Sequence, residues 1–341
     1  MLSFESDYNN GAHPVVLQHL IETNDVTSLT YGFDQWSVSA REKIRISTEC
    51  QNANVFFLNG GTQTNMTVID GCLQPYEAVI AVETGHINIH EAGAVEFTGH
   101  KVIALSHHNG KMSPDDLAKY MEWFTNDQSR EHLAQPGMVY ITFPTEFGTI
   151  YSKSEIDEIY NICKRFDLLL FIDGARLGYG LMVEDTDVTL SWLAQHCDVF
   201  YIGGTKVGAL CGEAVVFPRG NAPKHFFTTI KRHGALSAKG RTIGVQFDAL
   251  FTDNLYLTIA QHAIKMAMRL KKTFPAKGYQ MYIDSPSNQQ FVVIPNEKVE
   301  KLAQKVEFSI WDPYDQNSKI CRFVTSWATT EQQMKELESL L

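Results

Sequence analysis

The chain has 341 residues, of which 44% are hydrophobic and 20% charged, a composition typical of a globular protein with a large buried core. Its formal net charge of −10 and the lack of a basic run argue against a nucleic-acid partner. The six cysteines have neither a CxxC pair nor metal-ligand spacing, so we expect reduced thiols. Neither a secretory signal nor a membrane-spanning apolar window is recognisable, and we expect a cytoplasmic protein.

Six short apolar runs alternate with helical patterns along the first two thirds of the chain. Most are continuous, as is typical of strands buried on both faces of a parallel sheet. The runs are Val55–Leu58, Ala78–Val82, Val102–Leu105, Met138–Phe143, Leu168–Ile172 and Val199–Ile202. A seventh run, Ala214–Phe217, follows the last so closely that we expect these two strands to be antiparallel. The pattern predicts an α/β fold with a mainly parallel sheet and helices on both faces.

Helix-start signals lie between these runs. Ser39 and Glu42 have the spacing of a capping box, and so do Ser152 and Glu155. Ser113 precedes a proline and two acidic residues, a pattern typical of an N-cap followed by a first helical turn. These signals predict three of the helices that cover the sheet.

The pattern changes after about Thr242. We expect one long helix from Val245 to about Phe274, interrupted at 252–254, and then a smaller α+β region. Its predicted strands are Tyr279–Ile283, Gln290–Ile294, Ser309–Trp311 and Ile320–Ser326, and its predicted helices are Glu297–Lys305 and Thr330–Leu341. We therefore expect an N-terminal segment at 1–15, a large domain at 16–244 and a small C-terminal domain at 245–341.

Two of the apolar strands end in charged groups. Leu168–Ile172 runs into Asp173, and Val199–Ile202 runs through three small residues to Lys206. Ligands of an open α/β sheet bind at the carboxyl ends of its strands. A partly desolvated lysine can form an imine, and a carboxylate can keep a pyridinium nitrogen protonated. The pair predicts pyridoxal phosphate (PLP) on Lys206 with Asp173 at the ring nitrogen. A buried ion pair without chemistry is the alternative.

Two further features lie at the same predicted edge. A glycine-rich turn at Gly61 and Thr62 precedes a helical segment, and free N–H groups at a helix N-terminus bind phosphate. Glycine-rich turns before a helix are also common in loops that bind no ligand. His86 follows the strand Ala78–Val82, and its planar ring could stack on a flat cofactor or move protons. A surface or capping histidine is the alternative there.

With these residues identified, the chain resembles the L-threonine aldolase family, which is grouped with the β-eliminating lyases. The resemblance covers nearly the whole chain. The segments that carry it, in the family's order, are Phe4–Gly11 (FESDYNNG), Tyr31–Trp36 (YGFDQW), the turn at Gly61 and Thr62, His86, Pro144–Thr149 (PTEFGT), Asp173–Arg176 (DGAR), Gly203–Lys206 (GGTK) and Arg322–Trp327 (RFVTSW). It implies a fold type I (aspartate-aminotransferase-like) PLP enzyme. The implied reaction is retro-aldol cleavage of L-threonine, L-allo-threonine or a related β-hydroxy-α-amino acid, such as β-phenylserine, to glycine and an aldehyde.

The resemblance also implies roles residue by residue. Lys206 matches the Schiff-base lysine, Asp173 the pyridinium partner and His86 the stacking histidine. Gly61 and Thr62 match the phosphate-binding turn. The groups that match substrate-carboxylate ligands are Ser6 in the N-terminal segment, Arg176 (also near the cofactor) and Arg322. Tyr31 and Lys239 are candidate contacts near the cofactor, from the same chain or from a neighbouring subunit. The implied assembly is a homodimer or homotetramer with the active site at a subunit interface.

One departure from the family concerns the general base. Several members carry a histidine in the segment that matches Pro144–Thr149, where this chain has Glu146. A glutamate can act as a base if its pKa is raised. The group that takes the β-hydroxyl proton is therefore open among His86, His90, Glu91 and Glu146.

Two other functions remain alternatives. The nearer is another PLP reaction on the same fold, such as β-elimination or transamination, because a fold does not fix a function. Product analysis with threonine would separate it from aldol cleavage. The more distant alternative is a non-catalytic α/β binding module, which a visible cofactor absorbance lost on borohydride reduction would exclude.

Overall fold

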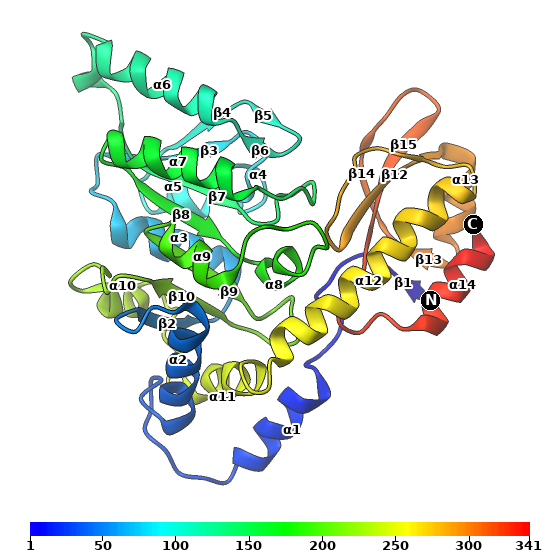
Figure 1. The fold of residues 1–341 in the computed structure, drawn as a ribbon, viewed down its shortest axis with the longest axis horizontal. Coiled ribbons are helices and arrows are strands. Elements are labelled where there is room, and N and C mark those ends of the chain that lie inside the picture. Colours follow the sequence, from blue (N-terminus) through cyan, green and yellow to red (C-terminus); the bar gives the residue numbers. More distant parts are fainter.

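A seven-stranded sheet forms the centre of the larger part of the molecule (Figure 1). The structure, a computed structural model, describes residues 1–341. The strands lie in the order β2-β10-β9-β8-β7-β3-β4. Their bounds are β2 (Asn54–Leu58), β3 (Glu77–Val82), β4 (Val102–Leu105), β7 (Gln135–Thr142), β8 (Leu169–Asp173), β9 (Val199–Gly203) and β10 (Glu213–Phe217). Only β10 is antiparallel to its neighbours, which confirms the predicted fold class and the predicted antiparallel pair.

The sheet is apolar on both faces because side chains alternate along each strand. In β9, Phe200 and Ile202 belong to one apolar cluster, whereas Val199 and Tyr201 belong to the cluster on the opposite face. This double burial explains why the strands appear in the sequence as continuous apolar runs. The edge strand β4 differs, since its Ala104 is exposed.

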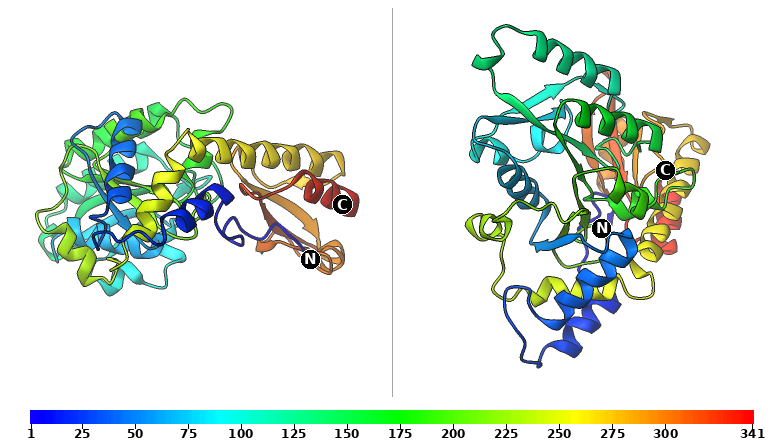
Figure 2. Two further views of the ribbon diagram at one scale, coloured as in Figure 1. Left: turned by 90° about the horizontal axis from the view of Figure 1, so that it is seen from below. Right: turned by 60° about the vertical axis from the view of Figure 1, so that its left-hand side comes forward.

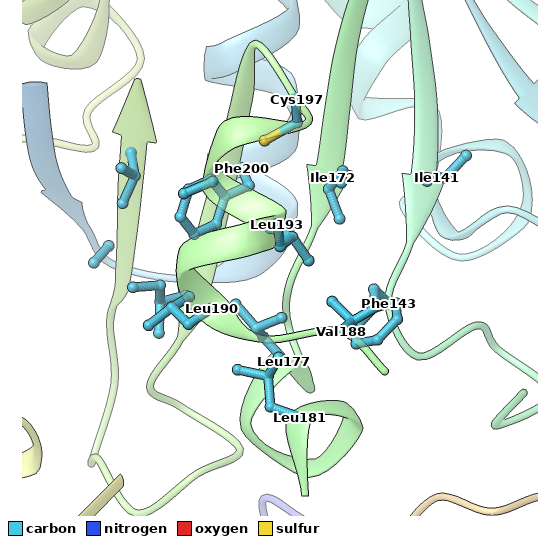
Figure 3. Packing of buried hydrophobic residues seen from close by; sticks show 14 of the residues in the cluster. Ile141, Phe143, Ile172, Leu177, Leu181, Val188, Leu190, Leu193, Cys197 and Phe200 are labelled. Atoms are coloured by element: carbon cyan, nitrogen blue, oxygen red, sulfur yellow. The ribbon is translucent and has the colours of Figure 1, made fainter. Parts of the chain in front are cut away.

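Helices cover both faces of this sheet. The first cluster is covered by α1 (Pro14–Thr23), α2 (Gln35–Thr48), α6 (Pro114–Asn126), α7 (Lys153–Arg165), α8 (Leu177–Leu181), α9 (Leu190–Gln195) and α11 (Arg241–Leu250). The second is covered by α3 (Gly61–Cys72), α4 (His86–Ile89), α5 (Ala94–Phe97) and α10 (Phe226–Arg232). Figure 3 shows part of the first cluster, where Leu190 and Leu193 of α9 pack with Ile172 and Phe200 of the strands.

Two of the three predicted helix starts are confirmed. The Ser152 hydroxyl accepts from the Glu155 N–H at 3.3 Å, and the Glu155 carboxylate accepts from the Ser152 N–H at 2.8 Å, so α7 begins with a capping box. Ser113 caps α6 in the predicted way. These bonds satisfy backbone donors that have no partner within the helix.

The predicted start at Ser39 is wrong. α2 begins at Gln35, because the Asp34 carboxylate accepts from the N–H and the hydroxyl of Ser37 at 2.8 and 2.7 Å. Aspartate is as good an N-cap as serine. The earlier of two competing signals therefore sets the start, and Ser39 lies inside the helix.

A long helix, α12 (Leu255–Ala276), leads from the large part to a four-stranded antiparallel sheet with the order β11-β12-β15-β14 (Figure 2). The elements of this smaller part are β11 (Gln280–Met281), β12 (Gln289–Pro295), α13 (Asn296–Ala303), β13 (Val306–Glu307), β14 (Ser309–Pro313), β15 (Ser318–Val324) and α14 (Glu331–Leu340). The predicted break between α11 and α12 is confirmed, and Asp253 and Asn254 there have positive φ values of 50° and 58°. The strand predicted at Tyr279–Ile283 shrinks to β11.

The N-terminal segment belongs to this smaller part before it enters the large one (Figure 1). Its strand β1 (Leu2–Ser3) pairs in parallel with β13, and the Phe4 carbonyl accepts from the Val324 N–H at 2.8 Å. Leu2 and Phe4 are buried in the apolar cluster of the smaller part. Two short strands, β5 (His107–His108) and β6 (Lys111–Met112), and a 3-10 turn (Arg130–His132) complete the chain. No helix in the structure has the length and apolar character needed to cross a membrane.

Candidate active site

A cleft of about 420 Å³ opens between the carboxyl edge of the seven-stranded sheet and the smaller part. Residues from three regions line it. The large part contributes Gly61, Thr62, His86, His90, Glu146, Arg176 and Lys206, the smaller part contributes Gln289, Trp311 and Arg322, and the N-terminal segment contributes Tyr8. A smaller cavity beside it reaches Asp173 and Glu91. The structure thus brings together most of the residues that the sequence singled out.

The ends of β8 and β9 approach each other too closely for side chains. A Cβ atom on Gly174 would lie 1.9 Å from the carbonyl oxygen of Tyr201, and one on Gly203 would lie 2.3 Å from that of Ala175. Only glycine fits at either position. This close approach sets the spacing between Asp173, which ends β8, and the Lys206 loop after β9.

The loop that carries Lys206 is fixed by hydrogen bonds on both sides. The Tyr179 hydroxyl donates to the Lys206 carbonyl at 2.6 Å. The Glu213 carboxylate accepts from the Gly204 N–H at 3.0 Å and from the Thr205 hydroxyl at 2.7 Å. Burial lowers the pKa of the Lys206 amine, and the positive charge of Arg176 lowers it further. A lysine in this state is suited to nucleophilic attack on a carbonyl.

Glu213, the first residue of β10, was not among the residues predicted from the sequence. The carboxyl is buried, and burial raises its pKa to about 7. Since β10 runs antiparallel to β9, its first residue lies opposite Gly203, at the edge where the parallel strands end. An acidic residue opening an apolar strand, together with the predicted antiparallel pairing, was the signal that could have located it.

Asp173 is a buried carboxylate with three hydrogen-bond donors. The Tyr140 hydroxyl donates at 2.6 Å, the Asn65 amide at 2.9 Å and the Ala175 N–H at 2.9 Å. Burial alone would raise the pKa of Asp173, but the charge of His86 and the bond from Tyr140 outweigh burial and hold the pKa below its usual value. The carboxylate is therefore ionised, as a partner of a pyridinium nitrogen must be.

His86 and Glu91 form a histidine–carboxylate pair. The His86 Nδ1 lies 2.7 Å from the Glu91 carboxylate, which also accepts from the Asn65 amide at 2.7 Å. The Glu91 side chain is fully buried and His86 is half-buried in the cleft wall. Because Nδ1 bonds to Glu91, Nε2 is the ring nitrogen of His86 that is left for a ligand.

Glu146 lies at the base of the cleft. Its carboxylate accepts from the His86 N–H at 2.9 Å and from the Thr142 hydroxyl at 2.9 Å. Burial raises the pKa of Glu146 to about 7. The carboxyl can therefore both accept and release a proton near neutral pH.

The two guanidinium groups in the cleft have different partners. Arg176 donates from Nε and Nη2 to both oxygens of Asp7, at 2.8 and 3.0 Å. Arg322 donates only to neutral groups, the Gln289 amide oxygen and the Ser309 hydroxyl, both at 3.2 Å, and its buried Nε has no partner. Burial and the charge of Arg176 lower the pKa of Arg322 to about 10. Asp7 thus neutralises the charge of Arg176, whereas Arg322 has no carboxylate partner and could pair with an anionic ligand.

Three of the predicted site residues line neither the cleft nor the cavity beside it. The Ser6 hydroxyl donates to the Asn9 side chain at 2.5 Å. Tyr31 and Lys239 lie together elsewhere, where the Tyr31 N–H donates to the Ala238 carbonyl at 3.0 Å. Both side chains are exposed, and Tyr31 lines a different cavity, between α2 and α10.

Comparison with known proteins identifies the family. The family model described as beta-eliminating lyase matches residues 18–290. The chain belongs to this family. A low specificity L-threonine aldolase from Pseudomonas sp. (strain NCIMB 10558) is 30% identical to it, with 98% of this chain and 95% of that relative covered. These matches confirm the resemblance predicted from the sequence.

Solved structures confirm the fold class. The structure of Leishmania major threonine aldolase is 37% identical, with a TM-score of 0.96 and coverage of 100% of this chain and 98% of that chain. An aspartate aminotransferase from Thermus thermophilus is only 13% identical, with a TM-score of 0.72 and coverage of 99% and 95%, and it supports the fold alone. The fold is therefore that of the fold type I PLP enzymes.

The cleft fits PLP, the cofactor expected from the sequence. α3 begins at Gly61 without a side-chain cap, so the N–H groups of its first turn remain free for a phosphate, and Thr62 adds a hydroxyl. Asp173 supplies an ionised carboxylate for the ring nitrogen, and Lys206 supplies the amine for the aldehyde. The phosphate, the ring nitrogen and the aldehyde of the cofactor thus each have a counterpart in the site.

Proposed function

We propose that this chain is a PLP-dependent aldehyde-lyase of the L-threonine aldolase type. It cleaves L-threonine, L-allo-threonine or a related L-β-hydroxy-α-amino acid to glycine and an aldehyde. The observation that carries this proposal is the grouping of a desolvated lysine, an ionised carboxylate and a guanidinium without an acidic partner in and beside one cleft. The chain is also 37% identical to Leishmania major threonine aldolase. When bound, PLP supplies an electron sink for the charge left at Cα.

The substrate carboxylate binds at Arg322. A half-buried guanidinium whose hydrogen-bond partners are all neutral is stabilised by an anion, and a carboxylate matches its planar fork. Arg176 lines the same cleft, and its Nη1 is the nitrogen that Asp7 leaves free. Ser6 is the third carboxylate ligand that the family resemblance implies, and its hydroxyl donates to Asn9 in this structure.

Glu146 takes the proton of the β-hydroxyl group. The Cα–Cβ bond then breaks, the aldehyde leaves, and Cα gains a proton to give glycine. A base is most effective when its pKa lies near the working pH, and the pKa of about 7 meets this condition. His86 is the second candidate base, because it lines the cleft and Glu91 orients its ring through Nδ1.

Product analysis tests this proposal. The PLP-loaded protein is incubated with L-threonine, L-allo-threonine, β-phenylserine and L-serine, and glycine, aldehyde, ammonia and keto acids are measured. We expect glycine and aldehyde in equal amounts. Ammonia or a keto acid without glycine would instead identify β-elimination or transamination. The Lys206→Ala variant is the control, because it should lose both turnover and the cofactor's visible absorbance.

The assembly is part of the same proposal. We infer a homodimer or homotetramer in which Tyr31 and Lys239 reach the cleft of a neighbouring subunit. Their exposure and their distance from the cleft of their own chain support this arrangement. The division into a segment at 1–15, a large domain at 16–244 and a small domain at 245–341 is proposed with it, as is a cytoplasmic location, which the six free thiols support.

A further inference from the structure

Asp7 joins three parts of the molecule at one buried point. Its side chain is fully buried and accepts from Arg176 of the large part through two bonds, and from the Asn288 amide of the smaller part at 2.9 Å. Asn288 also donates to the Thr325 carbonyl at 2.9 Å, close to the end of β15. A carboxylate with three donors and no solvent exposure is fixed in one orientation.

The segment that carries Asp7 is itself fixed. Three residues before Asp7, the carbonyl of Phe4 accepts from Val324, and Phe4 is buried in the apolar cluster of the smaller part. One residue after Asp7, the Tyr8 ring lies 5.9 Å from the Lys206 ammonium. The carboxylate therefore reaches Arg176 from a rigid anchor rather than from a loose terminus.

The charges around Lys206 show what Asp7 contributes. Arg176 is the cation that lowers the pKa of Lys206, and Asp7, Asp173 and Glu213 are the acids that oppose this effect. The Asp173 carboxylate accepts hydrogen bonds from Tyr140 and Asn65, and the Glu213 carboxylate accepts hydrogen bonds from the loop that carries Lys206. Of these three acids, Asp7 alone pairs directly with a cation, and without it the charge of Arg176 would be unopposed in a desolvated site.

We propose that Asp7 is a positioning residue for the reaction, fixing Arg176 with Nη1 toward the ligand and offsetting the positive charge that Arg176 places beside Lys206. The inference rests on the proposed function. It assigns a role to the N-terminal segment in the resting enzyme: the segment sets the geometry of one guanidinium and the charge balance at the cofactor lysine.

The first test is the pH titration of the cofactor's visible absorbance in the PLP-loaded enzyme. Asp7→Asn keeps the volume of the side chain but removes its charge. The midpoint of the titration should fall by about one pH unit or more, because an uncompensated cation disfavours a proton at the lysine nitrogen. Asn288→Ala disturbs the same junction without changing charge, and its midpoint should stay at the wild-type value.

The second test is the affinity for glycine, followed by the spectral change on binding. Asp7→Asn should weaken glycine binding at least about tenfold, because the orientation of Arg176 is lost. Asp7→Asn combined with Arg176→Gln should bind glycine no more weakly than Arg176→Gln alone, since Asp7 acts through Arg176. Arg176→Lys, which keeps the charge but not the fork, should weaken glycine binding and leave the midpoint in place.

The outcomes distinguish the role of Asp7 from the proposed function. An unchanged midpoint in Asp7→Asn, or an equal shift in Asn288→Ala, overturns the role of Asp7 while the proposed function stands. If Asp7→Asn does not fold, a normal glycine affinity in Arg176→Lys overturns the role of Asp7, because that role requires the guanidinium fork of Arg176 to contact the ligand. A wild-type protein without any visible cofactor band overturns the proposed function and this inference together.

Discussion

At the scale of single residues, the ionisation of Asp173 decides whether the cofactor can act as an electron sink. The charge of His86 and the hydrogen bond from Tyr140 hold the pKa of Asp173 below its usual value despite burial. We expect Asp173→Asn to retain PLP but to lose several orders of magnitude in kcat, because a neutral amide cannot keep the ring nitrogen protonated. Cofactor content and steady-state kinetics measure the two effects separately. A near-normal kcat would remove Asp173 from the mechanism.

The pKa of Glu146 predicts a pH dependence. Burial raises it to about 7, and only the ionised form can act as a base, so kcat/KM should rise with pH through about 7. Glu146→Gln should remove this limb and lower kcat by roughly 10²–10⁴-fold, the usual contribution of a general base. If the limb persists in the variant, a group other than Glu146 is the base.

The same shift has a consequence for stability. The folded state favours the protonated carboxyl, so the stability gained from Glu146 is present below its usual pKa of 4.5 and is lost as the pH rises to about 7. Denaturant titrations should show this loss in the wild type and not in Glu146→Gln. A parallel stability profile in both proteins would show that the carboxyl is not buried as described.

Lys206 and Asp173 could be located from the sequence because each follows a continuous apolar strand, and both line the same cavity in the structure. Asp7 could not, because its partner Arg176 is 169 residues away and no local pattern links them. The base remained ambiguous for a different reason. Four residues carry suitable groups, and only their packing shows that Glu91 lies behind His86 whereas Glu146 faces the cleft.

At the scale of elements, strands were predicted where both faces are buried, as in β8 and β9, because a short continuous apolar run between turn residues is typical of a doubly buried strand. Prediction was less accurate for the bounds of some elements. β11 covers only Gln280–Met281 of the strand predicted at Tyr279–Ile283. The start of α2 was misplaced because two capping residues competed, and the contacts of Asp34 are visible only in three dimensions.

β15 carries the most testable element-level feature. Its register places Arg322 opposite Ser309 of β14 and Phe291 of β12, and the guanidinium lies 5.1 Å from the centre of the Trp311 ring. We expect Arg322→Ala to weaken glycine and threonine binding by about 10–150-fold, the equivalent of a charge-assisted hydrogen bond. Arg322→Lys should recover only part, because an ammonium cannot make the two-pronged contact.

Spectral titration with glycine measures this effect. The absorbance of the ligand-free enzyme should be unchanged in both variants, since Arg322 does not hold the cofactor. Lys319→Ala is the control, because Lys319 is a cation on the same strand that does not line the cleft, and this variant should bind glycine normally. Normal glycine affinity in Arg322→Ala would place the carboxylate site elsewhere.

At the scale of the whole molecule, the cleft depends on three regions that are far apart in the sequence. The large part contributes Gly61, Thr62 and Lys206 to the lining of the cleft, and the smaller part contributes Arg322. The N-terminal segment crosses between them. The family resemblance predicted that all three regions contribute to the site, whereas local sequence patterns predicted only the contribution of the large part. The pairing of β1 with β13 could not be predicted, because two residues are too few to show a periodic pattern.

The contribution of neighbouring subunits can be tested at Lys239. Tyr31 adopts a left-handed conformation, with φ of 57°, and is exposed beside Lys239, away from the cleft of its own chain. If Lys239 acts in a neighbouring subunit, Lys206→Ala and Lys239→Ala should each be nearly inactive alone but complement each other when coexpressed. Half of the resulting dimers are mixed, and each has one site with both lysines intact, so we expect roughly a quarter of wild-type activity. A mixture that is no more active than its components would show that Lys239 serves its own chain or no site at all.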